Sequence, residues 1–445
     1  MTTLTGRQRM LAVGLIMSVT LVAFEVTAII TVLPTITAEL RGDSLFGVSM
    51  AVYTLANMVS LVAAGELADR YGPSRPFGIA VITFVVGLVV AAWAPSMVWV
   101  VVGRLLQGAG TGSFNPISYS LVRRAFPADR QPMMYTFLSA GWVVPSLVAP
   151  LVAGWITDAF GWRWTFLAII PVAVVVGGIA VRPMAEYRPV DKPRSRSRVP
   201  LAVAAASGVG MFVTGIRFDS LTVVLPLALG GLAIAVPALH RLLPRGYRSA
   251  SHGFAAVLVT RTLATACFGG ADGFIPLAAA RVHGAAPTVQ GFVVIGGALT
   301  WTFGQWLRAR TPDRPPGRSV GEGFAVLGLG VALSATVLFA WWPLWGTFVA
   351  WAVGGIGMGL LFNPTTVTAM GYATDGDEGH VSSQIALADS IGWSVMGGVG
   401  GATVAIADRG SIGIQSAIGT NFAIAIVLAL LGIAVSRRIR PATTH

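Results

Sequence analysis

Long apolar runs, separated by short polar segments, dominate this chain and constrain its fold most strongly. Each run is long enough to cross the hydrocarbon core of a bilayer, which is about 30 Å thick. A backbone in lipid must satisfy its own hydrogen bonds, so we expect every run to be an α-helix. The predicted spans are 10–34, 46–64, 77–94, 97–121, 133–156, 164–182, 199–216, 221–239, 253–280, 288–307, 323–340, 344–370, 383–406 and 413–436.

Composition agrees with a polytopic membrane protein. Only 11% of the 445 residues are charged, whereas soluble domains carry about 25%. The net charge of +12 lies mainly in short loops on one side of the predicted membrane. This distribution is the positive-inside bias, so it predicts cytoplasmic N- and C-termini in the cell membrane and argues against nucleic acid as a partner.

A segment rich in proline and arginine, 183–198, predicts the main domain boundary. We expect an N-terminal six-helix bundle in 1–182, a cytoplasmic linker with two extra spans in 183–252, and a C-terminal six-helix bundle in 253–445. The fold class is therefore all-α, with fourteen spans. The alternative is twelve spans plus a hairpin, because the two arms of 199–239 are near the lower length limit for crossing.

Recurring motifs predict that the two bundles arose from one duplicated unit. The recurring pairs have offsets of about 248 residues and are Asn115-Pro116 with Asn363-Pro364, Gly141-Trp142 with Gly392-Trp393, and Asp69-Arg70 with Asp313-Arg314. Two parallel repeats place a binding site near the membrane midplane, so Asn115 and Asn363 become candidate substrate ligands. The competing explanation is chance recurrence in a chain with 54 glycines.

Three carboxylates inside predicted spans are candidates for proton or substrate binding: Glu25, Asp272 and Asp389. Intramembrane acids are costly and are functional by default, which favours a proton-coupling role for Glu25 and Asp272. The alternatives are a structural hydrogen bond for Glu25 and a turn position for Asp272, whose glycine neighbours predict a broken helix. Asp389 either lines the cavity or pairs with a loop arginine near the cytoplasm.

Two arginines also fall within spans. Arg104 and Gln107 are three residues apart and therefore share one helix face. A fixed positive charge near an acid changes how readily that acid holds a proton, so Arg104 is a candidate relay partner and Gln107 a candidate substrate ligand. Helix packing is the alternative role for Arg104. Arg261 lies near the start of its span and is expected to snorkel to the cytoplasm; the alternative is that it pairs with a cavity acid.

Several motifs resemble those of the major facilitator superfamily. The loop after the second span matches its Gly-x-x-x-Asp-Arg-x-Gly signature at Gly65, Asp69, Arg70 and Gly72, while the usual basic pair is reduced to Arg75. Residues 104–108 resemble its Arg-x-x-Gln-Gly motif.

The resemblance extends to drug:proton antiporters with fourteen spans. Glu25 stands where their first-span motif usually has Asp, and the fifth span keeps Pro150 and Gly154 of the antiporter motif, with alanine at positions 140, 149 and 153. The resemblance implies a rocking exchange of protons for lipophilic cationic or neutral molecules, as in multidrug efflux and antibiotic resistance. It assigns conformational roles to the loop motif, Pro150 and Gly154.

Other functional classes find less support in the sequence. We find no phosphate-binding loop and no nucleophile elbow, so we expect neither an ATP-driven pump nor an enzyme. A single cysteine, Cys267, and unpatterned histidines predict no metal site and no cofactor. We expect a monomer whose partners are protons, a small-molecule substrate and lipid. The alternatives are a lipid or metabolite exporter or symporter of the same fold, or a non-transporting scaffold or receptor.

Overall fold

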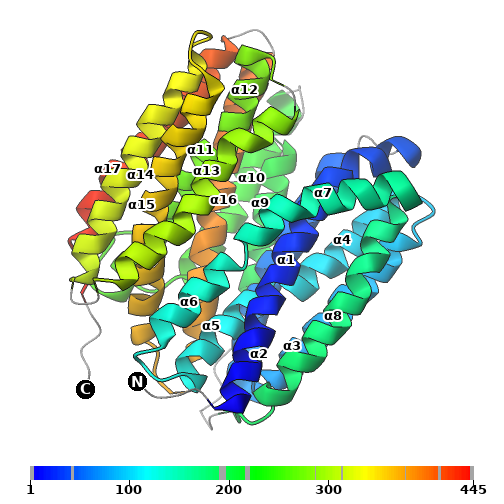
Figure 1. The fold of residues 1–445 in the computed structure, drawn as a ribbon, viewed down its shortest axis with the longest axis vertical. Helices are drawn as coiled ribbons and strands as arrows, with labels where there is room; N and C mark the ends of the chain where they lie inside the picture. Colours follow the sequence, from blue (N-terminus) through cyan, green and yellow to red (C-terminus); the bar gives the residue numbers. More distant parts are fainter. Residues whose placement is uncertain are drawn as a thin grey trace. The chain divides into compact units, whose positions relative to one another are not determined.

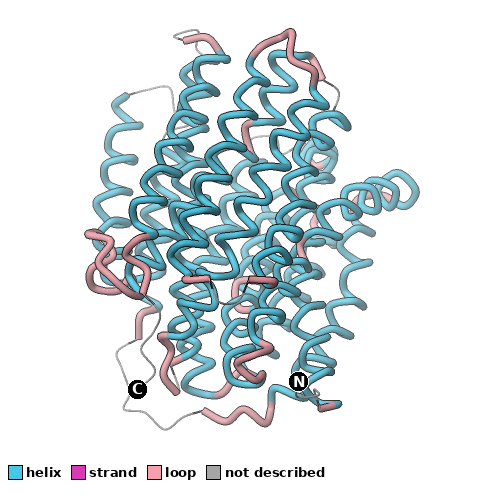
Figure 2. The backbone as a smooth tube through the Cα atoms, turned by 60° about the vertical axis from the view of Figure 1, so that its left-hand side comes forward, coloured by secondary structure: helices cyan, strands magenta, loops and turns pink. Residues whose placement is uncertain are grey.

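The computed structural model describes residues 5–41, 45–189, 197–215, 221–285, 287–311, 314–375, 377–408 and 412–440, and these residues form helices and loops (Figure 2). The helices are α1 (Gly6–Glu39), α2 (Phe46–Tyr71), α3 (Ser74–Ala92), α4 (Met97–Thr111), α5 (Phe114–Ala125), α6 (Gln131–Ala140), α7 (Val143–Phe160), α8 (Arg163–Met184), α9 (Val199–Gly215), α10 (Leu221–Leu242), α11 (Phe254–Asp272), α12 (Ile275–His283), α13 (Pro287–Ala309), α14 (Pro316–Ser334), the 3₁₀ turn η2 (Ala335–Leu338), α15 (Leu344–Gly371), α16 (Glu378–Asp408) and α17 (Ile414–Ser436).

The chain divides into two compact units. The first unit contains 1–243 and 373–386, and the second contains 244–372 and 387–445. In the first unit α1 packs on α7 and α8, α3 packs on α4 and α8, and α2 packs on α4 (Figure 1). The extra helices α9 and α10 pack on each other, and α9 also contacts α2. The division into 1–182, 183–252 and 253–445 stays a prediction.

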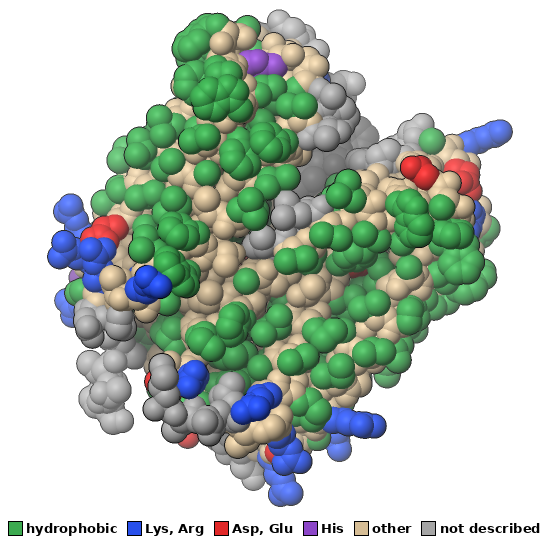
Figure 3. All heavy atoms as spheres, viewed as in Figure 1, with side chains coloured by type: hydrophobic (Ala, Val, Ile, Leu, Met, Phe, Trp, Pro, Cys, Tyr) green, Lys and Arg blue, Asp and Glu red, His purple; other side chains and the backbone are tan. Residues whose placement is uncertain are grey.

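The second unit is built around α15. This helix packs against α13, α14 and α11, while α17 packs against α11 and α14 (Figure 1). Many large apolar side chains remain exposed on outer helix faces of both units, as Ile82 on α3 and Leu430 on α17 illustrate. On the face drawn in Figure 3, hydrophobic side chains cover most of the helix surface and charged side chains gather at helix ends. Such surfaces suit lipid.

Three predicted spans are interrupted helices. The fourth span is divided at residues 112–113 between α4 and α5, and the fifth at 141–142 between α6 and α7. The break predicted beside Asp272 is present, because α11 ends at Asp272 and α12 begins at Ile275. By contrast, α15 continues through Pro364. The carbonyl of Leu360, which Pro364 cannot bond, accepts a hydrogen bond of 3.3 Å from Ser319 Oγ.

The described residues contain nine helices that are long and apolar enough to cross a membrane. The all-α membrane fold predicted from the sequence is thereby confirmed. The count of fourteen spans stays a prediction, and the turn expected at 217–219 lies outside the described residues. At the N-terminal end, a capping box sets the first residue of α1, because Thr5 accepts from the amide of Gln8 and the Gln8 side chain accepts from the amide of Thr5.

Candidate functional site

The first unit holds a buried ion pair between α1 and α4. Glu25 is 0% exposed and Arg104 is 1% exposed, and Arg104 Nη1 donates to Glu25 Oε1. The same Nη1 also donates to Gln107 Oε1 at 2.7 Å, as expected for side chains three residues apart on one helix face. Glu25 Oε2 accepts no hydrogen bond from any described residue. Glu25 therefore faces the interior of its own unit and not lipid.

Neighbouring side chains hold this pair in place. The guanidinium carbon of Arg104 lies 4.0 Å from the ring centroid of Tyr53 on α2, a cation–π contact. Gln107 Nε2 donates to the carbonyl of Gly87 on α3 at 3.2 Å. Thr111 Oγ1 donates to the Tyr53 hydroxyl at 2.9 Å. Four helices, α1 to α4, thus meet around Arg104 and Gln107, and their contacts hold both side chains in place.

The second unit holds a related pair, but without a cation. Trp351 Nε1 on α15 donates to Asp272 Oδ1 at the end of α11, at 2.9 Å. Asp272 is half-buried and forms no ion pair with any described residue. Asp272 follows Glu25 by 247 residues, and Trp351 follows Arg104 by the same 247 residues. Each unit thus has a hydrogen-bond donor beside the acid, charged in the first unit and neutral in the second. The duplication itself stays a prediction.

Four further aromatic rings connect to Trp351 in a chain of ring contacts. The ring of Phe268 on α11 lies 4.8 Å from Trp351, 5.1 Å from Trp301 and 6.1 Å from Trp393, measured between centroids. Trp301 also contacts Phe362 at 4.9 Å. We call these five residues the aromatic cluster. Trp351 is fully buried, while Trp393 is 43% exposed, so the cluster extends from the helix core to an accessible surface.

Arg261 forms an ion pair inside the second unit, so the structure favours the alternative of pairing with an acid over snorkelling to the cytoplasm. Its Nε and Nη2 donate to the two carboxylate oxygens of Asp389 at 2.6 and 2.9 Å. Its Nη1 donates to the Phe362 carbonyl at 2.9 Å and to Thr366 Oγ1 at 2.5 Å. Asp389 was expected to pair with a loop arginine or to line a cavity, but its partner is this span arginine. A bidentate pair of this kind satisfies both charges locally.

The remaining candidate ligands lie in different units. Asn115 is half-buried on α5 in the first unit, and Asn363 is buried on α15 in the second. Their roles stay predictions. Pro150 lies inside α7, as predicted from the antiporter motif. An added Cβ at Gly154 would meet no heavy atom within 4 Å, so close packing on this helix falls at the buried Ala149 and Ala153 instead.

The loop that carries the signature residues Gly65, Asp69, Arg70 and Gly72 contacts the start of α16. Residues 378–386 of α16 belong to the first unit. Asp69 Oδ1 accepts from the amide of Gly379 and Oδ2 accepts from the amide of His380, both at 2.8 Å. Asp69 therefore caps α16 and complements the positive end of its helix dipole. A Cβ at Gly65 would lie 2.2 Å from the Gly379 carbonyl, so glycine is required for this approach.

The other signature residues take simpler positions. Gly72 has φ of +78°, a conformation that favours glycine, and ends α2. Arg70 and Arg75 are exposed, and the Arg70 guanidinium lies 5.1 Å from the Tyr71 ring centroid.

A second link to the start of α16 runs through Arg198, which sequence reasoning did not identify. Glu66 Oε2 on α2 accepts from the backbone amide of Arg198 at 3.1 Å. Arg198 Nη1 lies 2.7 Å from His380 Nε2. Burial, and then the nearby Arg198 charge, lower the pKa of His380 to about 4. At neutral pH the ring is therefore uncharged and accepts a hydrogen bond from Arg198.

We expect Asp69→Ala to expose the first amides of α16 without unfolding the unit. Loss of a helix cap costs about 1 kcal/mol, so hydrogen exchange at Gly379 and His380 should speed up about fivefold. Exchange mass spectrometry on the full chain measures this change. Asp129→Ala is the matched control, because Asp129 is exposed and its ion pair among the described residues is a 3.8 Å contact with Arg130. Unchanged exchange in Asp69→Ala would contradict the capping role.

Sequence reasoning missed Tyr53, Trp351 and the rest of the aromatic cluster. Tryptophans at span ends are membrane anchors, but Trp301 and Trp351 lie inside α13 and α15, away from the ends. That mid-span position was an available signal. The described residues contain no group of three or more His, Cys, Asp or Glu side chains placed to hold a metal. Cys267 is a buried free thiol.

Comparison with known proteins gives a family and a set of relatives. The sequence model described as Major Facilitator Superfamily matches residues 15–396. An uncharacterized MFS-type transporter of Mycobacterium tuberculosis is 28% identical over 400 residues, which cover 83% of this chain and 57% of the relative. A probable multidrug-efflux transporter of the same species is 25% identical over 430 residues, covering 92% of this chain and 89% of the relative.

The fold has close matches among solved structures. The crystal structure of the human organic anion transporter MFSD10 matches with a TM-score of 0.72 at 11% identity, covering 96% of this chain and 99% of that chain. At this identity the match concerns the fold alone. The chain spans about three fifths of the length of the first curated relatives that it matches, at 57% and 62%.

Proposed function

Because this chain belongs to the Major Facilitator Superfamily, we propose that it is a proton-coupled transporter that exports lipophilic cationic or neutral small molecules. The chain is a multi-pass membrane protein of a transporter family. We place it in the cell membrane as a monomer with cytoplasmic termini. Its closer kinship, we propose, is with drug:proton antiporters; one relative is named a probable multidrug-efflux transporter, which supports the drug-efflux part of this proposal.

The observation that carries the proposal is the unmatched charge of Asp272. Among the described spans, Glu25 is paired with Arg104 and Asp389 with Arg261, whereas Asp272 has the neutral Trp351 as its partner. A carboxylate within a span is costly when its charge is uncompensated. Asp272 is therefore suited to hold either a proton or a cationic substrate, and competition between the two would couple their movements.

The aromatic cluster supports the proposed substrate class. Aromatic faces attract organic cations and also accept neutral apolar groups. Trp393 is partly exposed and is linked through Phe268 to Trp351, which contacts Asp272. A lipophilic cation would thus meet rings beside an acid.

We give Glu25 and Arg104 a different role in the same cycle. Their pair is enclosed, so a proton reaches Glu25 only when α1 and α4 separate. Separation would leave a buried carboxylate that takes up a proton. The cap that Asp69 provides to α16 would form and break during the same rearrangement.

We expect the purified chain in proteoliposomes to exchange tetraphenylphosphonium, a lipophilic cation, against protons. When the cation leaves the liposomes, protons should enter and acidify the lumen. An imposed pH gradient should in turn drive accumulation of the cation. A trapped pH-sensitive dye and labelled tetraphenylphosphonium measure the two movements together. Protein-free liposomes are the control for the cation's own leak.

The other outcomes separate the alternatives. Protons and cargo that move in the same direction would indicate a symporter. Counterflow of cargo without any proton movement would contradict proton coupling. A failure of a broad panel of lipids, metabolites and drugs to move would favour a scaffold or receptor.

A further inference from the structure

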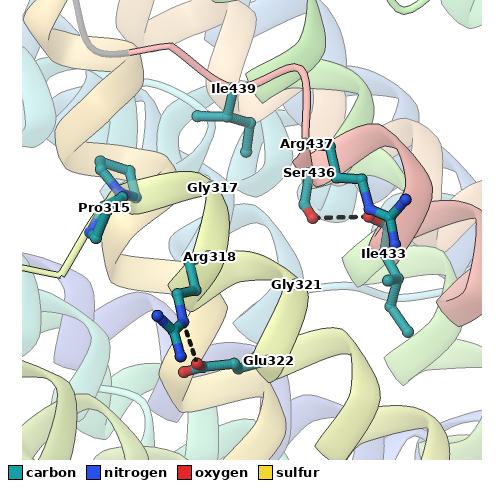
Figure 4. Close-up of a pocket in the computed structure, with 10 residues that line it drawn as sticks. Pro315, Gly317, Arg318, Gly321, Glu322, Ile433, Ser436, Arg437 and Ile439 are labelled. Carbon is teal, nitrogen blue, oxygen red and sulfur yellow. Dashed lines mark hydrogen bonds and ion pairs between the residues drawn. The ribbon is translucent and has the colours of Figure 1, made fainter.

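We propose that the second unit binds the headgroup of an anionic phospholipid in a pocket between α14 and α17. The pocket has a volume of about 650 Å³ and lies where α14 begins and α17 ends (Figure 4). It does not include any residue of the transport site described above. The proposal is therefore independent of which substrate the chain carries.

Close packing of the two helices forms the hollow. An added Cβ at Gly317 would lie 2.6 Å from the Ser436 carbonyl, and one at Gly321 would lie 2.8 Å from Ser436 Oγ. Because these two positions on α14 carry no side chain, the end of α17 at Ser436 approaches α14 closely there. Pro315, Pro316, Ile433 and Ile439 form its apolar walls.

Positive charge dominates the polar part of the lining. Figure 4 shows Arg318 with Glu322 on α14 and Arg437 on the other wall, directly after the end of α17. Glu322 accepts from Arg318 Nε at 3.1 Å and from Arg314 Nη1 at 2.5 Å, so two arginines take up its charge. Arg437 makes no ion pair or side-chain hydrogen bond with any described residue. Arg318 keeps its two terminal nitrogens available, and the pocket therefore suits a phosphate group.

An apolar track continues from the pocket along the membrane-facing surface. Leu329 and Leu333 follow Glu322 at helical spacing on α14, and Ile433 and Leu430 precede Arg437 at helical spacing on α17. Leu329 and Leu430 are more than half exposed, at 53% and 61%. A free phosphate ion would use the arginines alone. A phospholipid would also place its acyl chains along this track, so the combined arrangement favours the lipid.

Native mass spectrometry of the full chain, delipidated and mixed with dioleoylphosphatidylglycerol or dioleoylphosphatidylcholine, tests the proposal. We expect the anionic lipid to be retained at least about tenfold more tightly. Arg318→Gln combined with Arg437→Gln should weaken its binding about thirtyfold. The control, Arg182→Gln with Arg188→Gln, makes the same charge change at two exposed arginines of the first unit and should change little.

Three results would overturn the proposal. These are equal retention of the two lipids by the unaltered chain, equal loss in the two double variants, and displacement of the lipid by glycerol phosphate at the same concentration. The last result would identify a soluble phosphate as the ligand. If a variant does not fold, equal retention of the two lipids by the unaltered chain still overturns the proposal.

Discussion

Arg104→Met is expected to destabilise the first unit by about 3–5 kcal/mol, because it leaves the buried Glu25 carboxylate without its partner. Glu25 is 0% exposed and water cannot replace the lost guanidinium. Gln107 also loses the donor that reaches its Oε1 at 2.7 Å. Equilibrium unfolding in mixed micelles, followed by tryptophan fluorescence, measures the change in the free energy of unfolding.

Two further variants separate the buried charge from other effects of the substitution. Arg163→Met also removes an ion pair, with Glu39, but there the two side chains are 42% and 52% exposed. We expect it to cost at most about 1 kcal/mol. The double variant Glu25→Gln with Arg104→Met should recover most of the loss, because no unpaired charge remains. Equal losses in Arg104→Met and Arg163→Met would contradict the ion pair's structural role.

The sequence was sufficient to predict the membrane fold, because burying charge in lipid is costly and charged residues are therefore largely absent from the spans. Long apolar runs can only be helices in a bilayer, and glycines flanking Asp272 marked a real interruption. Helix breaks elsewhere were harder. Pro364 leaves α15 intact because Ser319, on another helix, bonds the freed carbonyl. Such compensation depends on packing and cannot be read from a local pattern.

Pairing of the intramembrane charges was the other limit. Arg104 was expected to act near an acid, and the structure supplies Glu25. For Arg261, snorkelling to the cytoplasm was preferred over pairing with an acid, because its depth in the span was judged from sequence position. Its partner Asp389 is 128 residues away in the sequence. Arg261 on α11 reaches the Asp389 carboxylate on α16 and the Phe362 carbonyl on α15 only because these helices pack together in the fold. Asp272 and Trp351 each follow a member of the Glu25–Arg104 pair by 247 residues. Trp351 was nevertheless missed, because a neutral side chain does not stand out in a search for intramembrane charges.

Asp272 has a neutral partner among the described residues, so its substitution should affect transport and not stability. In Asp272→Asn we expect substrate-driven proton movement to fall to the level of protein-free liposomes. Asparagine keeps an oxygen that accepts from Trp351 Nε1, and no cation is left unpaired among the described residues. The free energy of unfolding should therefore change by no more than about 1 kcal/mol.

Asp389→Asn is the matched control, since it makes the same chemical change in the same unit with the opposite expectation. It leaves Arg261, which is 1% exposed, without its bidentate partner, so it should cost about 3–5 kcal/mol of stability. Measuring unfolding and proton-coupled tetraphenylphosphonium flux on both variants separates the two roles. Normal coupling in a stably folded Asp272→Asn would remove Asp272 from the mechanism and leave Glu25 as the acid to test next. Loss of coupling together with several kcal/mol of stability would instead make Asp272 a structural residue.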